Sequence, residues 1–403
     1  MPRGLVNAMG QNNCFLNVVV QSLWHLEAFR ARFGGSGADD GVAVAASSGS
    51  GAWGKKPQVW NGGGAAAAAE ATNTSVAAAE ENKPSHRVEA SLRALFRELS
   101  EVEGSGSGGG GVSDGSGYAP APAPASRGIA AGSSSGGNGT TGASVEALRA
   151  ALAELSGARF GAGKMDDAAE AMETILGCLV QGSSATVIRQ VFSMGIREAL
   201  ICPRCGMSSP EKPATYEANV FYAHVSALRE AREKAPLCPF DVALREASHG
   251  DLVTCRNAAV CPIARRRERL PSQRSITGEP PSVFSLGLVW NNWGPGLVAD
   301  LLGMLSPVID LDVVFFRGQE HGGAGAPGEV SAGKAQLRGF FCFQVQKHHY
   351  VAFVYNRGRQ EWLLLDDDQA VPIGPEFAGV LARCDEDKLH PSLFFYEREY
   401  QLP

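Results

Sequence analysis

Apolar residues recur with helical spacing through the first half of the chain. In residues 14–32, Leu16, Val19, Val20 and Leu23 fall at i, i+3, i+4 and i+7, which predicts an amphipathic helix. Three further stripes have similar spacing: Val88, Leu92, Leu95, Phe96 and Leu99; Val145, Leu148, Leu152 and Leu155; and Met172, Ile175, Leu176 and Leu179. The last follows Asp166 and Asp167, which suit the positive end of a helix dipole. We therefore predict a helical subdomain.

The pattern of the sequence changes at about residue 186. From there on, short apolar runs, prolines and cysteine pairs indicate strands joined by turns. A helical piece interrupts them at 223–234. Apolar runs predict core strands at 283–290, 309–316 and 339–345, and two more, at 349–355 and 360–366, flank a turn. Helices followed by antiparallel strands predict an α+β fold.

Two stretches interrupt this pattern. Residues 34–83 consist largely of Gly, Ala, Ser and Asn, and residues 103–143 of Gly and Ser with a short Ala-Pro run. Neither contains enough large apolar residues to offset the entropy of ordering the chain, so we expect disordered insertions. The remainder is still long enough for one ordinary domain with a sizeable core.

Composition narrows the functional classes. A net charge of −6 argues against nucleic acid as the main partner, and no apolar run approaches the roughly 18 residues of a membrane span. Polar residues and glycine follow Met1-Pro2-Arg3, so we expect no signal peptide, no membrane association, and a cytoplasmic or nuclear location. In such a compartment the nine cysteines are expected to be thiols, metal ligands or a nucleophile.

One cysteine stands where a nucleophile is expected. Cys14 opens the first predicted helix, where unpaired N–H groups and the helix dipole stabilise a thiolate. Far along the chain, His349 and Asp366 lie 17 residues apart with a turn midway, so a hairpin would bring them together. A thiol hydrolase needs such a nucleophile, base and orienting acid, which meet only in the fold.

The other notable cysteines form two pairs. Cys202 and Cys205 make a C-x2-C pair, and Cys255 and Cys261 follow 49 residues later. Four thiolates in two pairs are typical of structural zinc, although the second spacing is longer than usual. Cys238 or His224 could replace one ligand, and an incomplete site remains the alternative.

The motifs around these residues resemble the ubiquitin-specific protease family. The residues that match its cysteine box are Gly4, Leu5, Asn7, Gly10, Cys14, Phe15, Asn17, Gln21 and Leu23. The run His349-Tyr350-Val351-Ala352-Phe353, followed by Trp362 and Asp366-Asp367, resembles its histidine box. Two extra residues separate Asn7 from Cys14, and the form is closest to the divergent branch that includes the plant ubiquitin carboxyl-terminal hydrolase-related proteins.

The resemblance implies one catalytic domain over residues 1–403, with a papain-like fold of helical thumb, β-rich palm and zinc-ribbon-like fingers at 186–280. It implies ubiquitin and its conjugates as partners, with Asp167 facing the arginine-bearing tail of ubiquitin. Asp367 would contact substrate, support the site or simply form a turn. Asn7 is the motif match for the oxyanion donor, with Asn12 and Gln11 as alternatives because of the longer loop.

The resulting hypothesis is a thiol-dependent deubiquitinase that cuts after the C-terminal glycine of ubiquitin. The altered cysteine loop motivates a second hypothesis, a catalytically weak or inactive ubiquitin-binding scaffold. A hydrolase for a ubiquitin-like modifier is the third.

Overall fold

The structure is a computed structural model that describes residues 4–34, 83–105, 143–291, 295–315 and 331–399. Apart from their edges, the insertions predicted at 34–83 and 103–143 lie outside the described residues. Among the residues described, no helix combines the length and apolar character needed to cross a bilayer.

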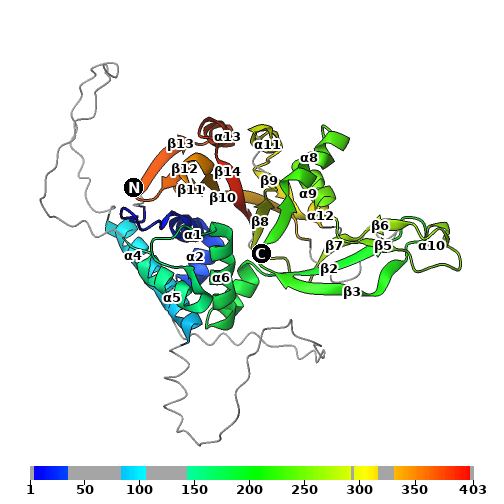
Figure 1. The fold of residues 1–403 in the computed structure, drawn as a ribbon, viewed down its shortest axis with the longest axis horizontal. Coiled ribbons are helices and arrows are strands. Elements are labelled where there is room, and N and C mark those ends of the chain that lie inside the picture. The colour runs from blue at the N-terminus through cyan, green and yellow to red at the C-terminus, as the bar shows by residue number, and fades with distance from the viewer. Residues whose placement is uncertain (1–3, 35–82, 106–142, 292–294, 316–330, 400–403) are drawn as a thin grey trace, which may run out of the picture.

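The first half of the chain folds into the predicted helical subdomain (Figure 1). Its elements are α1 (Cys14–His25), α2 (Glu27–Phe33), α4 (Pro84–Ser105), α5 (Glu146–Ser156), β1 (Gly157–Phe160), α6 (Ala168–Gln181) and α7 (Ala185–Val191). The single helix predicted over 14–32 is wrong, because the chain is extended at Leu26. The Ala28 N–H donates to the buried Glu397 carboxylate at 2.6 Å, so a residue from the far end of the chain caps the new helix.

An eight-stranded sheet forms the centre of the molecule, in the order β13-β12-β11-β10-β14-β8-β4 with β9 beside β10. The strands are β4 (Phe221–His224), β8 (Val283–Val289), β9 (Val308–Asp310), β10 (Lys334–Gln344), β11 (His349–Asn356), β12 (Glu361–Asp366), β13 (Gln369–Gly374) and β14 (His390–Arg398). The strand predicted over 309–316 is wrong beyond Asp310. The Asp310 carboxylate caps α12 (Leu311–Val314) by accepting from the Asp312 N–H.

Helices cover both faces of this sheet, and alternate strand residues enter two separate cores. On β11, Ala352 and Val354 pack with the helical subdomain, whereas Val351 and Phe353 join the second core. Packed into that second core are α8 (Val225–Lys234), α9 (Phe240–Ala247), α11 (Pro295–Leu302), α12 and α13 (Phe377–Glu386). The predicted α+β class is confirmed.

A separate arm extends away from the sheet (Figure 1). It contains β2 (Met194–Ile201), β3 (Ser208–Ala218) and β7 (Gln273–Thr277), with β5 (Leu252–Thr254), β6 (Arg269–Pro271) and α10 (Pro262–Arg265) at its far end. We call this arm, residues 194–218 and 252–277, the fingers. The arm takes up only part of the predicted span 186–280, because β4, α8 and α9 within that span belong to the central sheet and the second core.

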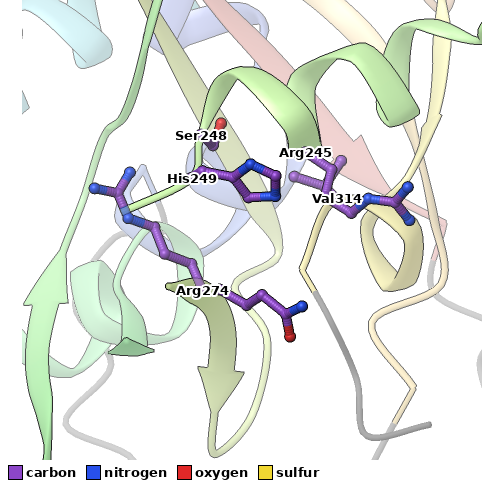
Figure 2. A pocket seen from close by; sticks show the side chains of 6 residues that line it. Arg245, Ser248, His249, Arg274 and Val314 are labelled. Carbon is purple, nitrogen blue, oxygen red and sulfur yellow. The ribbon is translucent and has the colours of Figure 1, made fainter. Parts of the chain in front are cut away.

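A small pocket lies between the end of α9, strand β7 and helix α12 (Figure 2). Its lining is rich in basic side chains and consists of Arg245, Ser248, His249, Gln273, Arg274 and Val314. The cavity volume of about 10 Å³ is close to the space that one water molecule needs. The pocket is therefore too small to bind a side chain or a chain terminus of a protein substrate.

Candidate active site

Cys14 is the first residue of α1, and the residue is 1% exposed. Its N–H belongs to the first helical turn, where N–H groups have no acceptor within the helix. The Sγ atom lies 3.6 Å from the Sδ atom of Met165, a residue of the loop that leads into α6. The thiol thus sits under a neighbouring loop, at the electropositive end of a buried helix.

The predicted hairpin brings His349 and Asp366 together. His349 opens β11, Asp366 closes β12, and the His349 Nε2 atom lies 2.6 Å from the Asp366 Oδ1 atom. Hydrogen bonds to Asp366 and then to Cys14 raise the pKa of His349 to about 10. The same bond to His349 lowers the pKa of Asp366. The carboxylate and the nearby thiol thus both favour the charged form of this imidazole.

Asp367 is the point at which the two distant motifs join. Its Oδ2 atom accepts from the Asn7 Nδ2 group at 2.8 Å, and its Oδ1 atom accepts from the Asn17 Nδ2 group at 2.8 Å. Its backbone oxygen accepts from the Gln21 side chain and from the Leu5 N–H. Both carboxylate oxygens are therefore engaged within the protein, which favours a supporting role over contact with substrate.

The three candidates for the oxyanion donor lie in different surroundings. Asn7 is half-buried, and its Oδ1 atom accepts from the Asn13 N–H at 2.9 Å, one residue before the nucleophile. Asn12 is exposed, has a φ of 53°, and donates to the Gly163 carbonyl at 2.9 Å. Gln11 donates to the Glu146 carboxylate. Of the three, Asn7 lies between Asp367 and the Asn13–Cys14 backbone.

Sequence reasoning missed Arg149 of α5, whose residue is only 4% exposed. Its guanidinium donates to the Asn13 side chain at 2.7 Å and to the Phe160 carbonyl at 2.9 Å, and it lies over the Phe15 ring. A signal was available in the sequence. Arg149 stands four residues after Val145, in the apolar stripe of its helix, where a charged residue is unusual.

Asp167 caps helix α6. Its Oδ1 atom accepts from the Ala169 and Glu170 N–H groups at 2.8 and 3.1 Å, yet the residue is exposed. Burial first, and then the Asp167 charge, raise the pKa of Tyr350, the residue next to His349. The start of α6 therefore lies close to strand β11, which carries His349.

The four cysteines of the predicted metal site form one cluster in the fingers. Their Sγ atoms all lie within 4.8 Å of one another, with Cys202 and Cys261 3.7 Å apart and Cys205 and Cys255 3.6 Å apart. A tetrahedral ion bound at about 2.3 Å requires sulfur atoms about 3.8 Å apart, so this cluster could hold a metal ion.

The two substitute ligands lie elsewhere. Cys238 packs against the second core, and the His224 Nδ1 atom lies 3.3 Å from the Asn291 side chain. Within the cluster, backbone N–H groups at the start of α10, first that of Ala264, lower the pKa of Cys261 to about 7. This favours the thiolate that a metal binds.

A cysteine, a histidine and an aspartate assembled between a helix N-terminus and an antiparallel hairpin define the papain-like class of fold and site. The family model described as "Ubiquitin carboxyl-terminal hydrolase" matches residues 3–293, well over half of the chain. The chain therefore belongs to the ubiquitin carboxyl-terminal hydrolase family, as its motifs predicted. The closer placement in the plant branch stays a prediction.

Individual relatives agree with this placement. The chain is 27% identical over 272 residues to mouse ubiquitin carboxyl-terminal hydrolase 54, and 24% identical over 266 residues to the human hydrolase 53. Each alignment covers 62% of this chain, but only 16% of the mouse protein and 23% of the human one. The chain thus spans less than a quarter of the length of these relatives.

Solved structures show the fold. A structure of the SAGA deubiquitinase module of Ubp8, Sgf11, Sus1 and Sgf73 bound to monoubiquitin matches with a TM-score of 0.52 at 14% identity, covering 99% of this chain and 70% of that one. A second structure of the same module gives a TM-score of 0.50 at 14% identity, over 99% and 68%. The expected fold with thumb, palm and fingers is confirmed.

Proposed function

We propose that this chain is a thiol-dependent deubiquitinase that hydrolyses the bond after the C-terminal glycine of ubiquitin. The observation that carries the proposal is the His349 imidazole, which lies 2.6 Å from the Asp366 carboxylate and whose pKa is raised by Asp366 and by the neighbouring Cys14. A cysteine paired with a cationic imidazole supplies the thiolate that attacks a carbonyl. Membership of the family supplies the substrate class.

The reaction follows from these contacts. The Cys14 thiolate attacks the terminal carbonyl carbon of ubiquitin, and the tetrahedral intermediate collapses as the bond to the lysine nitrogen breaks. The His349 imidazolium gives its Nδ1 proton to that nitrogen, because its Nε2 atom is bonded to Asp366. Neutral His349 then takes a proton from water, whose oxygen attacks the thioester and releases Cys14 and ubiquitin.

For the oxyanion we propose the Cys14 N–H together with the Asn7 amide. Asn7 shares hydrogen bonds with Asn13 and Asp367, so its amide is fixed beside the nucleophile. The amide nitrogen carries two hydrogens, and the bond to Asp367 uses one of them. The second hydrogen would serve the oxyanion.

Ubiquitin recognition is proposed to begin at helix α6. Asp167 is exposed, acidic and close to strand β11, which carries His349. It therefore suits the basic tail of ubiquitin that leads to its C-terminal glycine. The relatives carry the name ubiquitin carboxyl-terminal hydrolase, and a structural neighbour was solved bound to monoubiquitin.

We propose that the four-cysteine cluster holds structural zinc. The sulfur spacing, the closed set of four thiols and the absence of an open ligand position among them favour a structural ion over a catalytic one. Cys202 and Cys205 follow β2, whereas Cys255 and Cys261 flank the turn before α10. The ion would hold the far end of the fingers together, and it takes no part in the chemical steps.

The proposal is tested with a ubiquitin probe that carries an electrophile at its C-terminus, followed by mass spectrometry of the intact protein. We expect one covalent adduct with the natural chain and none with Cys14→Ala. His349→Ala should label far more slowly. Cys178→Ala is the matched control, because burial raises the pKa of that thiol to about 11 and keeps it unreactive.

The scaffold hypothesis keeps support from one observation, the 1% exposure of Cys14 beneath Met165. Ubiquitin bound without an adduct would establish the scaffold and overturn the enzyme. Labelling by a ubiquitin-like probe in preference to ubiquitin would establish the third hypothesis.

A further inference from the structure

Arg149 connects two loops that meet at the nucleophile. We call residues 8–13 the cysteine loop and residues 161–167 the entry loop, since the latter leads into α6. The guanidinium donates to the Gln11 and Asn12 carbonyls and to the Asn13 side chain on the cysteine loop. It also donates to the Gly161 and Lys164 carbonyls of the entry loop and to the Phe160 carbonyl just before that loop. One side chain thus joins both loops to helix α5.

These contacts use the full donor set of a guanidinium. Five N–H groups in a rigid planar fork can serve several carbonyls at once, whereas a lysine ammonium offers three donors from a single point. Burial lowers the pKa of Arg149, so the surrounding oxygens must compensate for a charge removed from water. An arginine placed in this way fixes the positions of its acceptors.

From Arg149 a series of hydrogen bonds reaches Asp367, whose carboxylate forms a longer ion pair with the base. Arg149 donates to the Asn13 side chain at 2.7 Å, the Asn13 N–H donates to the Asn7 Oδ1 atom at 2.9 Å, and Asn7 donates to Asp367 at 2.8 Å. The Asp367 Oδ2 atom lies 4.0 Å from the His349 Nε2 atom. Each link involves a backbone or side-chain group next to the reacting atoms.

The entry loop gains the same support. Asn12 donates to the Gly163 carbonyl, and a Cβ added at Gly163 would stand 3.4 Å from the Gly10 carbonyl, so the two loops lie in contact. Met165, which covers the Cys14 sulfur, follows directly after the Lys164 carbonyl that Arg149 binds. The position of Met165 over the thiol is therefore tied to Arg149 as well.

We propose that Arg149 is a positioning residue, which sets the cysteine loop, and through Asn13 and Asn7 the oxyanion donors, against Cys14. This inference rests on the proposed function for its kinetic consequence. Among the described residues, the hydrogen bonds of Arg149 go to the two loops and to Phe160 and not to Cys14 or His349, so it would act through the residues it holds. It acts on the step in which charge develops at the scissile carbonyl. Asp167 at the end of the entry loop is held by its own bonds to the Ala169 and Glu170 N–H groups, so the start of α6 stays in place when Arg149 is replaced.

The kinetic test uses a fluorogenic amide of ubiquitin. In Arg149→Lys we expect kcat to fall about 100-fold, the size of effect seen when an oxyanion donor is lost. KM should stay within about threefold of the natural value. Asn13→Ala removes the side-chain oxygen that accepts from Arg149 without removing a buried charge, so it should likewise lower kcat and leave KM nearly unchanged. Arg87→Lys is the control, because its ion pair with Glu154 is on the surface.

Two further measurements separate positioning from general destabilisation. Added guanidinium ion, compared with equal sodium chloride, should restore part of kcat in Arg149→Gly and change nothing in Arg87→Gly. Hydrogen exchange should become faster in residues 8–14 and 160–165 of Arg149→Lys together, while exchange in the fingers stays the same. The exchange measurement requires no turnover, so it applies even if the natural chain is inactive.

The outcomes are distinct. No turnover by the natural chain, combined with faster exchange in both loops of the variant, would overturn the proposed function and support the structural part of the inference. Normal kcat in Arg149→Lys, or unchanged exchange in both loops, would overturn the inference and leave the proposed function intact. A rise in KM alone would also overturn it, because Arg149 would then act on binding.

Discussion

Replacing Asp366 with asparagine removes a negative charge and keeps the shape of the site. The side-chain oxygen of the new asparagine would still accept from the His349 Nε2–H group, so the tautomer that presents Nδ1 to Cys14 is preserved. The change therefore isolates the electrostatic support of the imidazolium from the orientation of the ring.

The size of that support follows from the pKa of His349, which rises from 6.5 to about 10. At about 1.4 kcal/mol for each pKa unit, this corresponds to about 5 kcal/mol in favour of the charged imidazole. Asp366 is the largest contributor, but its side chain is 47% exposed, so solvent screens its charge. We assign about 2 kcal/mol to the charge of Asp366, which corresponds to a loss of about 30-fold in kcat.

The assay is the pH dependence of kcat/KM on a ubiquitin amide. Activity requires protonated His349 and falls as pH rises through the pKa of that group, so the natural chain should lose activity only near pH 10. In Asp366→Asn the alkaline limb should begin at about pH 8.5, in line with 2 kcal/mol. Asp368→Asn, an exposed neighbour, is the control with the same change of charge.

An alkaline limb that stays near pH 10 in Asp366→Asn would refute this reasoning, since the charge of Asp366 would then contribute nothing. A loss of activity far above 100-fold with an unmoved limb would mean that Asp366 acts mainly by orienting the ring.

Three further predictions follow from the site and its surroundings. The raised pKa of His349 means that the folded state holds the imidazole proton more tightly than the unfolded state. The contribution of His349 to stability is therefore complete below about pH 6.5 and lost as pH rises through about 10. Urea unfolding should show this decline in the natural chain and not in His349→Gln. Gly4→Ala should lower both activity and melting temperature, at a cost of about 1–3 kcal/mol, because the added Cβ would stand 1.9 Å from the Asp367 carbonyl oxygen. The control is Gly296→Ala, where a Cβ meets nothing within 4 Å. Equal melting temperatures of the two variants would contradict the close approach at Gly4. If zinc occupies the fingers, a strong chelator should release one zinc per chain and lower the melting temperature, as should Cys205→Ala; an unchanged melting curve with no zinc released would argue against the structural ion.

Local patterns predicted much of this protein. The resemblance of the motifs to the family placed Cys14 with His349 and Asp366. Helical stripes predicted the thumb, apolar runs predicted most palm strands, and the turn between two strands predicted that His349 meets Asp366. These features succeed because each depends on residues that are close in the chain or on a turn between them. The hairpin of β11 and β12 is of this kind, since its turn alone aligns His349 with Asp366.

Two of the three missed features, the break at Leu26 and the role of Arg149, depend on distant partners, whereas the third has a local cause. The residues near Leu26 do not predict the break between α1 and α2, because the carboxylate that caps α2 comes from Glu397. The strand predicted over 309–316 ends early because a carboxylate cap at Asp310 outweighs the apolar run that follows it. Arg149 was overlooked because its acceptors are mostly backbone carbonyls, which carry no residue-specific signal.

The separation of the two halves of the site has a consequence during biosynthesis. Cys14 emerges early, whereas His349 and the acceptor Asp367, which binds Asn7 and Asn17, follow more than 300 residues later. At synthesis rates of about 5–20 residues per second, the thiol waits about 20–70 s for its base. During that interval the newly made chain carries a cysteine that lacks its catalytic partner. The proposed catalytic site would therefore be complete only once strands β11 and β12, which carry His349 and Asp366, have been made.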